Sequence, residues 1–318
     1  GALCVAGVRG AELVSEEEFT YPQPWWIPGE GCLHLFTMYT GLRELYWNRS
    51  ADGRSWTPPR KLAGMQGHYQ TSRRLGQRVM TAFNRHPDQK PNNRTDLYYL
   101  ETRDMGESWQ TIDGQTIDPP LTDPECEALV RQYSSEGRYV YMKDIAFDAD
   151  ENPVILHLVS HHFQPGPAGD PRIWMIAHWQ GDRWVFHEVT RSTHNYDTGS
   201  LDLSDDSAWR VIGPTEPGPQ YWGTGGEIAI WLSHDRGATW QRQRMITSQS
   251  PRNHGYVRRP IDAHPDFDAF WADGDPDAPS ISRLYFTNRD GDRVRRLPAE
   301  MTADDTAPET VAGPSTAL

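Results

Sequence analysis

Residues 233–240 read SHDRGATW, and this stretch decides the fold. In the pattern S-x-D-x-G-x-T-W, the aspartate can accept hydrogen bonds from backbone N–H groups of its own turn, and the glycine supplies a positive φ. Residues 102–109, TRDMGESW, have the same form, and residues 50–56, SADGRSW, are a copy one residue shorter. Each copy follows an alternating, aromatic run, so each predicts a hairpin turn between two strands.

These turns resemble the Asp-box, or BNR repeat, of sialidase-like β-propellers. The resemblance implies an all-β fold of four-stranded blades, in which Asp52, Asp104 and Asp235 are structural and lie in outer turns, away from the ligand. The tryptophans that close the turns recur about every 55 residues, with one longer gap at an insertion, as the blades of a propeller would produce. We expect equivalent blade positions for Trp56, Trp109, Trp184 and Trp240.

Composition agrees with an all-β chain and bounds the function. The 318 residues include 13 Trp, 13 Tyr, 27 Gly and 25 Pro, which suits many short strands and turns. The net charge of −13 argues against nucleic acid as a partner, and no apolar run is long enough to span a membrane. Cys4, Cys32 and Cys126 fit no disulfide framework or zinc motif and are expected to be free thiols. No signal peptide is visible, so no compartment is assigned, although a secreted or periplasmic location is favoured.

Short alternating runs divide the chain into five groups of four strands. We predict a propeller domain over residues 21–298, after the remnant of a preceding blade and a link at residues 1–20. Residues 299–318 lack apolar spacing and are predicted to be a disordered tail. An insertion at residues 113–137 is expected to wall the binding face and to contain a short helix near residues 125–132. The first residues favour a larger, seven-bladed propeller whose N-terminal part is absent from this sequence.

Propellers bind ligands near the central axis, where the innermost strand of each blade begins. Polar and aromatic residues recur at that place in successive groups, which indicates a surface that faces a ligand. The alternative is that these side chains fill the core, with their polar tips bonded to the backbone. The predicted substrate-binding residues are His68, His86, His194, Asn195, Tyr196 and Arg258.

A second resemblance concerns residues 68–99, in which HYQTS, TAFNRHP and NRTDLYY follow one another. YPQP at residues 21–24, DIAFD at residues 144–148 and Arg259-Pro260 fit the same pattern. Together they resemble the BNR-repeat propeller family that includes ulvan lyases and rhamnosyl-glucuronate lyases, over residues 19–298. The resemblance implies a polysaccharide lyase whose partner is an acidic oligo- or polysaccharide.

The resemblance also implies that Tyr69 and Arg85 are catalytic. β-Elimination beside a uronate needs a neutralised carboxylate, a base for the C5 proton and an acid for the leaving oxygen. Arg85 would pair with the carboxylate, and Tyr69 would be the acid, the base or both, assisted by His68 or His86. Tyr69 and Arg85 lie on either side of the turn at Leu75-Gly76, so both are expected toward the same end of the blade.

The chain departs from these lyases in one respect: their D-x-H-N motif, one blade upstream of the tyrosine, does not occur here. A sialidase-type glycosidase is an alternative, for which Arg85, Arg258, Arg259 and Glu227 are available, but the Arg-Ile-Pro motif usual near its start does not occur. A non-catalytic glycan-binding propeller is a further alternative, because one fold hosts many functions. Asp-rich turns suit a structural Ca²⁺ ion, but no metal ligands are assigned.

Overall fold

The computed structural model describes residues 4–7, 10–13, 18–300 and 306–311. The chain divides into two compact units, residues 1–145 with 181–184 and residues 146–180 with 185–318. Within the described residues, helical structure is limited to the short 3₁₀ helices Pro87–Gln89, Tyr133–Glu136 and Pro167–Gly169. That part of the chain contains no helix long and apolar enough to cross a membrane.

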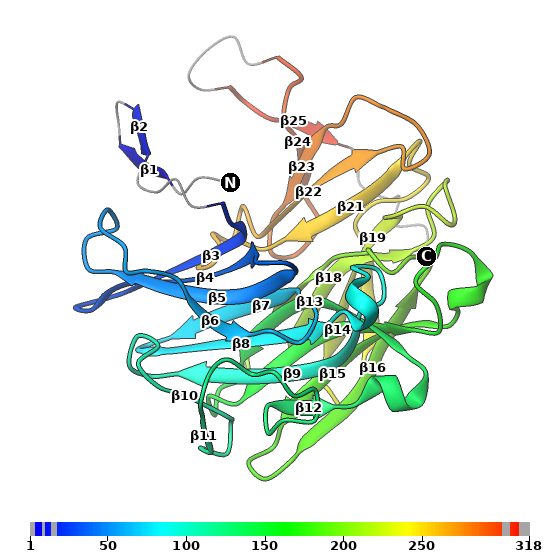
Figure 1. Cartoon of the computed structure of the whole chain (residues 1–318). Coiled ribbons are helices and arrows are strands. Elements are labelled where there is room, and N and C mark those ends of the chain that lie inside the picture. The colour runs from blue at the N-terminus through cyan, green and yellow to red at the C-terminus, as the bar shows by residue number, and fades with distance from the viewer. Residues whose placement is uncertain (1–3, 8–9, 14–17, 301–305, 312–318) are drawn as a thin grey trace. The chain divides into compact units, whose positions relative to one another are not determined.

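The first unit contains a hairpin and two larger sheets (Figure 1). In the hairpin, β1 (Cys4–Gly7) pairs antiparallel with β2 (Gly10–Leu13). The next sheet has the order β3 (Thr20–Ile27), β4 (Gly31–Tyr39), β5 (Arg43–Ser50), β6 (Arg60–Ala63). The following sheet runs β7 (Gln70–Leu75), β8 (Arg78–Arg85), β9 (Thr95–Thr102), β10 (Trp109–Gln110), β11 (Thr116–Ile117), and β12 (Leu129–Arg131) also pairs with β9.

The remaining sheets follow the same order of strands. One contains β13 (Tyr139–Phe147), β14 (Pro153–Ser160), β15 (Arg172–Trp179) and β16 (Trp184–Ser192). The fourth large sheet contains β17 (Ser200–Asp202), β18 (Trp209–Glu216), β19 (Glu227–Ser233) and β20 (Gln241–Met245). The fifth contains β21 (Asn253–Arg258), β22 (Ala269–Gly274), β23 (Leu284–Thr287), β24 (Val294–Arg296) and β25 (Glu309–Val311).

Apart from β12, which pairs with β9, strands that are neighbours in the chain are neighbours in every large sheet, as in a propeller blade. The prediction of an all-β fold built from blade-like sheets is therefore confirmed. The seven-bladed ring stays a prediction, and part of the predicted blade remnant at residues 1–20 lies outside the described residues.

Two local predictions are wrong. Glu309–Val311 form β25 inside the predicted disordered tail, because they pair antiparallel with β24 and Glu309 accepts a 2.9 Å hydrogen bond from Arg296 Nε. The helix expected near residues 125–132 is absent from that segment: Leu129–Arg131 are extended as β12 and pair with β9. In both segments, pairing with an available strand edge outweighs the local composition.

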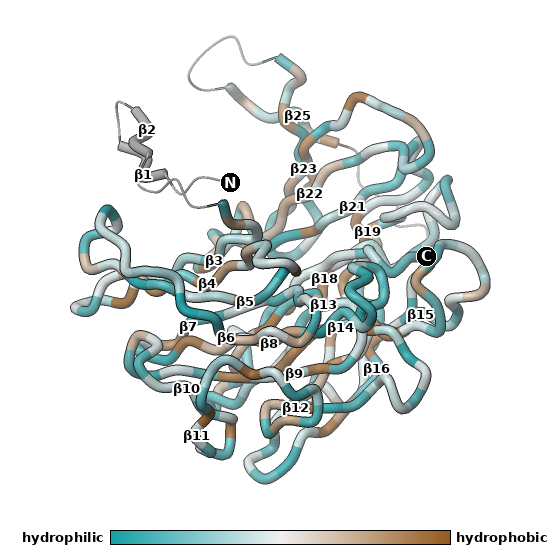
Figure 2. Tube along the Cα trace, in the orientation of Figure 1, coloured by the Kyte–Doolittle hydropathy of each residue, from teal (hydrophilic) through white to brown (hydrophobic). Residues whose placement is uncertain are grey.

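The core of the first unit includes the middle strands of its second large sheet. Every residue of β9 is buried, and so is every residue of β8 except Arg85. Figure 2 shows hydrophobic residues along both strands. Phe83 stacks on Tyr98 with ring centres 5.1 Å apart. Cys32 and Cys126 are free thiols, as predicted, and burial raises the pKa of Cys32 to about 11.

The Asp-box turns join the third strand to the fourth in their sheets. Asp235 Oδ1 accepts the Thr239 backbone N–H at 2.8 Å, and Asp235 Oδ2 accepts the Thr239 hydroxyl at 2.6 Å. Asp104 accepts hydrogen bonds from the backbone N–H and the hydroxyl of Ser108, at 3.0 and 2.6 Å. Asp52 accepts two backbone N–H groups, each at 2.8 Å. Trp109 and Trp184 are the first residues of β10 and β16, Trp240 directly precedes β20, and Trp56 lies in the loop before β6. The equivalence of their blade positions stays a prediction.

Asp235→Ala is expected to lower the free energy of unfolding by about 1–2 kcal/mol, because a turn N–H and a hydroxyl lose their acceptor. Hydrogen bonds from Thr239 and Ser233 lower the pKa of Asp235 to about 2. Since the folded pKa is depressed, this contribution is present above the unfolded pKa of roughly 4 and is lost as pH falls toward 2. Urea unfolding at pH 7 and pH 3 tests both statements. Asp182→Ala, in an exposed turn without the motif, is the control, and equal stability of both variants would contradict the prediction.

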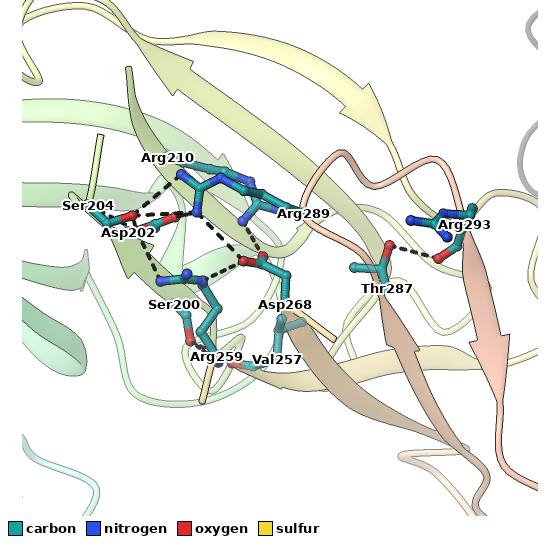
Figure 3. Close-up of polar contacts among 10 residues, drawn as sticks. All are labelled: Ser200, Asp202, Ser204, Arg210, Val257, Arg259, Asp268, Thr287, Arg289 and Arg293. Atoms are coloured by element: carbon teal, nitrogen blue, oxygen red, sulfur yellow. Dashed lines mark hydrogen bonds and ion pairs between the residues drawn. The ribbon is translucent and has the colours of Figure 1, made fainter. Parts of the chain in front are cut away.

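A buried charge network joins the last two sheets of the second unit (Figure 3). Asp268, which precedes β22, is 1% exposed and binds Arg210 of β18 and Arg259, the latter through Nε at 3.1 Å. Arg259 Nη1 also binds Asp202 Oδ1 at 3.0 Å, and Arg289 Nη1 binds Asp202 Oδ2 at 2.9 Å. Three guanidinium groups thus share two carboxylates: Asp268 binds Arg210 and Arg259, and Asp202 of β17 binds Arg259 and Arg289.

Candidate functional site

The backbone fixes Tyr69 at the start of an innermost strand. Tyr69 directly precedes β7, and its N–H donates to Asn84 Oδ1 at 3.1 Å, while the Asn84 N–H donates to the Tyr69 carbonyl at 3.1 Å. Buried Asn84 also donates from Nδ2 to the Val140 carbonyl at 3.0 Å. One amide side chain therefore holds Tyr69, its partner strand β8 and the start of β13 together.

Two arginines place positive charge on Tyr69. Arg43, the first residue of β5, donates a hydrogen bond from Nη1 to the Tyr69 hydroxyl. The Arg94 guanidinium carbon lies 4.0 Å from the centre of the Tyr69 ring and 5.0 Å from that of Tyr141. Tyr69 is half-buried, so solvent screens these charges less than it would at an open surface. The phenol thus lies between two cations.

Arg43 is surrounded by phenol groups. Its Nη2 donates to the Tyr39 hydroxyl, and its guanidinium carbon lies 5.2 Å from the centre of the Tyr21 ring. Burial alone would lower the pKa of Arg43, but the neighbouring tyrosines more than offset this effect, so the pKa is raised. Partial burial, and then contact with Tyr69, raise the pKa of Tyr21, which stays protonated at neutral pH. Arg43 is therefore a fixed, permanent cation.

His86 supports the Tyr69 ring as a neutral group. The two ring centres are 4.8 Å apart. Burial, and then the positive charges of Arg94, His68 and Arg43, lower the pKa of His86 to about 2. Its Nε2 finds no hydrogen-bond partner among the described residues. At neutral pH this imidazole has no proton to donate from a cationic form, so its effect on Tyr69 is one of packing.

His68 is bonded to the backbone at both ring nitrogens. Nε2 accepts the Met65 N–H at 3.0 Å, and Nδ1 donates to the Asn84 carbonyl at 2.9 Å. The side chain is buried, and burial lowers its pKa to about 4. Of the two arrangements that the sequence left open for His68, the structure shows the one in which the side chain fills the core.

Arg85 does not lie beside Tyr69. Gln70 pairs with Phe83, which places Tyr69 opposite Asn84, and successive side chains of a strand alternate between the two faces. Arg85 therefore lies on the other face of the strand pair, where its Nε binds Asp96 Oδ2 at 2.7 Å. A role for Arg85 on a substrate carboxylate would require its guanidinium to leave this largely buried partner.

Three predicted residues of the second unit share one loop. His194 Nδ1 accepts the Tyr196 N–H at 3.1 Å and lies 3.1 Å from Thr224 Oγ1. Asn195 Nδ2 donates to the His162 carbonyl at 2.8 Å.

Arg258 of β21 lies over an exposed aromatic ring, with its guanidinium carbon 4.6 Å from the centre of the Tyr256 ring. Within the described residues no group of three or more His, Cys, Asp or Glu side chains could hold a metal ion, so the Ca²⁺ expectation has no ligand set there.

Comparison with known protein families shows to which family this chain is related. The model of the BNR repeat-containing family matches residues 9–192, more than half of the sequence. The chain belongs to this family. The Asp-box resemblance seen in the sequence is therefore confirmed, although none of the curated proteins is similar to this BNR-repeat protein in sequence.

Solved structures share the fold of the BNR-repeat protein at low identity. A polysaccharide lyase PL25 ulvan lyase bound to -[GlcA(1-4)Rha3S]- superimposes with a TM-score of 0.73 at 15% identity, covering 89% of this chain and 68% of the other. Polysaccharide lyase Uly1 gives 0.58 at 11% identity, covering 85% and 58%. A Hadza microbial sialidase gives 0.53 at 11% identity, covering 88% and 58%. These likenesses show the fold alone.

The sequence did not indicate Arg43 and Arg94, the two cations beside Tyr69, or the neighbouring Tyr21. Arg94 lies inside the segment NRTDLYY and Tyr21 begins YPQP, so both stood within recognised motifs without an assigned role. Arg43 carries no local signal, because it reaches Tyr69 only through the β4–β5 hairpin.

Proposed function

We propose that this chain is a carbohydrate-active protein that cleaves uronate-containing glycans by β-elimination. The observation that carries the proposal is the hydrogen bond from Arg43 to the Tyr69 hydroxyl, with Arg94 packed on the same ring. A permanent cation on a phenol oxygen stabilises the negative charge that develops when that oxygen loses its proton. The glucuronate-containing ligand of the PL25 ulvan lyase, which shares this fold, supports the choice of substrate class.

The proposed reaction needs only one proton-transfer group. In the reacting form, the Tyr69 oxygen has lost its proton, is held by the hydrogen bond from Arg43, and takes the proton from C5 of the uronate. The C5–H electron pair forms the C4–C5 double bond, and the C4–O bond breaks. The leaving oxygen then takes the proton from Tyr69, which restores the starting state. Arg43 and Arg94 neutralise the uronate carboxylate, which makes the C5 proton more acidic.

The histidines near Tyr69 are poor candidates for this role. An effective acid or base has a pKa near the working pH. The pKa of His86 is about 2 and that of His68 is about 4, and both rings are buried. Tyr21 meets Tyr69 edge to face at 5.1 Å, but its pKa is raised. Tyr69, whose hydroxyl accepts a hydrogen bond from Arg43, is the group in this cluster that we assign to proton transfer.

Incubation with uronate-containing oligosaccharides tests the proposal, because elimination creates a double bond conjugated with the carboxylate that absorbs ultraviolet light. We expect absorbance to rise together with new reducing ends. New reducing ends without absorbance would favour the sialidase-type glycosidase, and binding without either signal would favour the glycan-binding propeller. Either outcome overturns the lyase proposal.

Arg43→Ala is expected to lower kcat/KM about 100-fold with little change in thermal stability, because a half-exposed cation is lost from the reacting oxygen. Arg85→Ala is expected to leave kcat/KM nearly unchanged and to lower the thermal stability. It leaves the carboxylate of Asp96, which is 1% exposed, without its ion-pair partner, at a cost of about 3 kcal/mol. Steady-state kinetics and thermal unfolding of both variants make the comparison. Lost turnover in Arg85→Ala at unchanged stability would assign the carboxylate to Arg85 instead of Arg43.

A further inference from the structure

A loop of the second unit presents aromatic side chains to solvent. Residues 217–226 connect β18 to β19 and read PGPQYWGTGG. Tyr221 is 49% exposed, and the half-buried Trp222 meets it edge to face with ring centres 4.7 Å apart. Tyr256 of the neighbouring strand β21 is 63% exposed. Exposed aromatic side chains on neighbouring elements are typical of binding surfaces.

Buried polar side chains hold this loop in one conformation. Asn253 donates from Nδ2 to the Gln220 carbonyl at 2.9 Å, and its Oδ1 accepts the Gln220 N–H at 3.2 Å. Asp197 Oδ1 accepts the Gly225 N–H at 2.7 Å. The backbones of Gly226 and His254 exchange hydrogen bonds at 2.9 and 2.8 Å. Asn253 and Asp197 are both buried, so these bonds are protected from water.

The glycines of the loop allow close packing that a side chain would prevent. A Cβ on Gly218 would lie 2.2 Å from Asn253 Oδ1, and one on Gly223 would lie 2.1 Å from Pro276 Cγ. A Cβ added to Gly255, the residue before Tyr256, would lie 3.7 Å from the Gly225 Cα. The loop and the start of β21 therefore form one packed surface.

The backbone of Tyr256 is strained. Its φ is +59°, a region that aromatic residues rarely adopt and that costs free energy. Such strain persists where the surrounding structure enforces it, and it is concentrated at functional sites. The Tyr256 ring is mostly exposed. It lies under the Arg258 guanidinium, whose carbon is 4.6 Å from the ring centre. The strained conformation thus presents an aromatic face with a cation beside it.

We propose that Tyr221, Trp222 and Tyr256 form a stacking platform for a sugar ring of an acidic glycan. The C–H faces of a pyranose pack on aromatic rings, while its hydroxyls reach polar groups at the edge. Arg258 supplies the positive charge that a uronate carboxylate requires. A platform held rigid before binding loses little conformational entropy when the ligand arrives. The choice of an acidic glycan rests on the proposed function, whereas the stacking surface does not.

Binding by a full-length protein that carries Tyr69→Phe tests the platform without turnover. Calorimetric titration with glucuronate–rhamnose oligosaccharides should show about tenfold weaker binding after Tyr221→Ala with Tyr256→Ala. Tyr221→Phe should bind as the parent does, because the ring is kept. Trp26→Ala, which removes an exposed tryptophan of β3, is the matched control and should bind normally. Thermal unfolding checks that each variant is folded.

Three results overturn the platform: normal affinity of the folded double variant, equal loss in Trp26→Ala, or no binding by the parent. The outcome is separable from the fate of the lyase proposal. Weaker binding by the double variant would support the platform. If the unmodified protein at the same time forms no unsaturated product, the lyase proposal is wrong while the platform stands. If the unmodified protein forms unsaturated product but the double variant binds with unchanged affinity, only the platform proposal is wrong.

Discussion

Tyr69→Phe is expected to lower kcat for elimination about a thousandfold and to leave oligosaccharide binding within a few-fold of the parent. Only the hydroxyl is removed, so the ring still packs between His86 and Arg94. The loss falls on kcat because proton transfer occurs in the transition state and contributes little to ground-state binding. Absorbance of the unsaturated product gives kcat, and calorimetry gives the affinity.

Tyr39→Phe is the matched control for this prediction. Tyr39 also accepts a hydrogen bond from Arg43, but it is largely exposed. Its variant therefore removes a phenol from the same guanidinium without removing the proposed proton-transfer group. We expect its kcat to stay within a few-fold of the parent. Equal losses in the two variants would show that tyrosine contacts merely position Arg43, and retained turnover in Tyr69→Phe would remove Tyr69 from the chemistry.

Asp268→Ala is expected to lower the free energy of unfolding of the second unit by about 3–5 kcal/mol. The variant leaves Arg210, whose side chain is 5% exposed, without its carboxylate partner. Burial already lowers the pKa of Arg210, while Asp268 opposes that shift, so the unpaired guanidinium would be costly. Urea unfolding of the variant and of the parent measures the difference.

The control for this prediction is a similar ion pair at the surface. Asp266 binds Arg293 Nη2 at 2.6 Å, but both side chains are more than half exposed. Asp266→Ala should therefore cost less than 1 kcal/mol. Comparable losses in the two variants would show that burial does not set the energy of the network. A stable Asp268→Ala variant would mean that Asp202 alone can compensate the arginines.

The Asp-box turns were predictable because their code is local. An aspartate, a glycine and a hydroxyl residue within eight positions specify which backbone groups meet, and Asp235 bonds within its own turn. The blade order followed, since each turn marks the third and fourth strands of a sheet. Tyr69 was predicted on an innermost strand, and it lies one residue before β7.

The partners of Tyr69 were not predictable from local spacing. Tyr69 and Arg85 lie toward the same end of the strand pair, as their distance from the turn at Leu75-Gly76 predicted, but strand alternation places Arg85 on the opposite face. Arg43 reaches Tyr69 from another sheet, and a single sequence gives no information on which hairpins of different blades converge. Composition failed at β25 as well, because the strand depends on the free edge of β24.

The pairing of β25 with β24 bears on how shortened versions of this protein will behave in solution. β25 is three residues long and carries Glu309 at its start, so it ends the fifth sheet with a brief, charged border. Removing residues 301–318 would leave the backbone groups of β24 open along that side. Preparations of the shortened chain should then scatter more light as protein concentration rises, whereas versions that keep the border should remain dispersed.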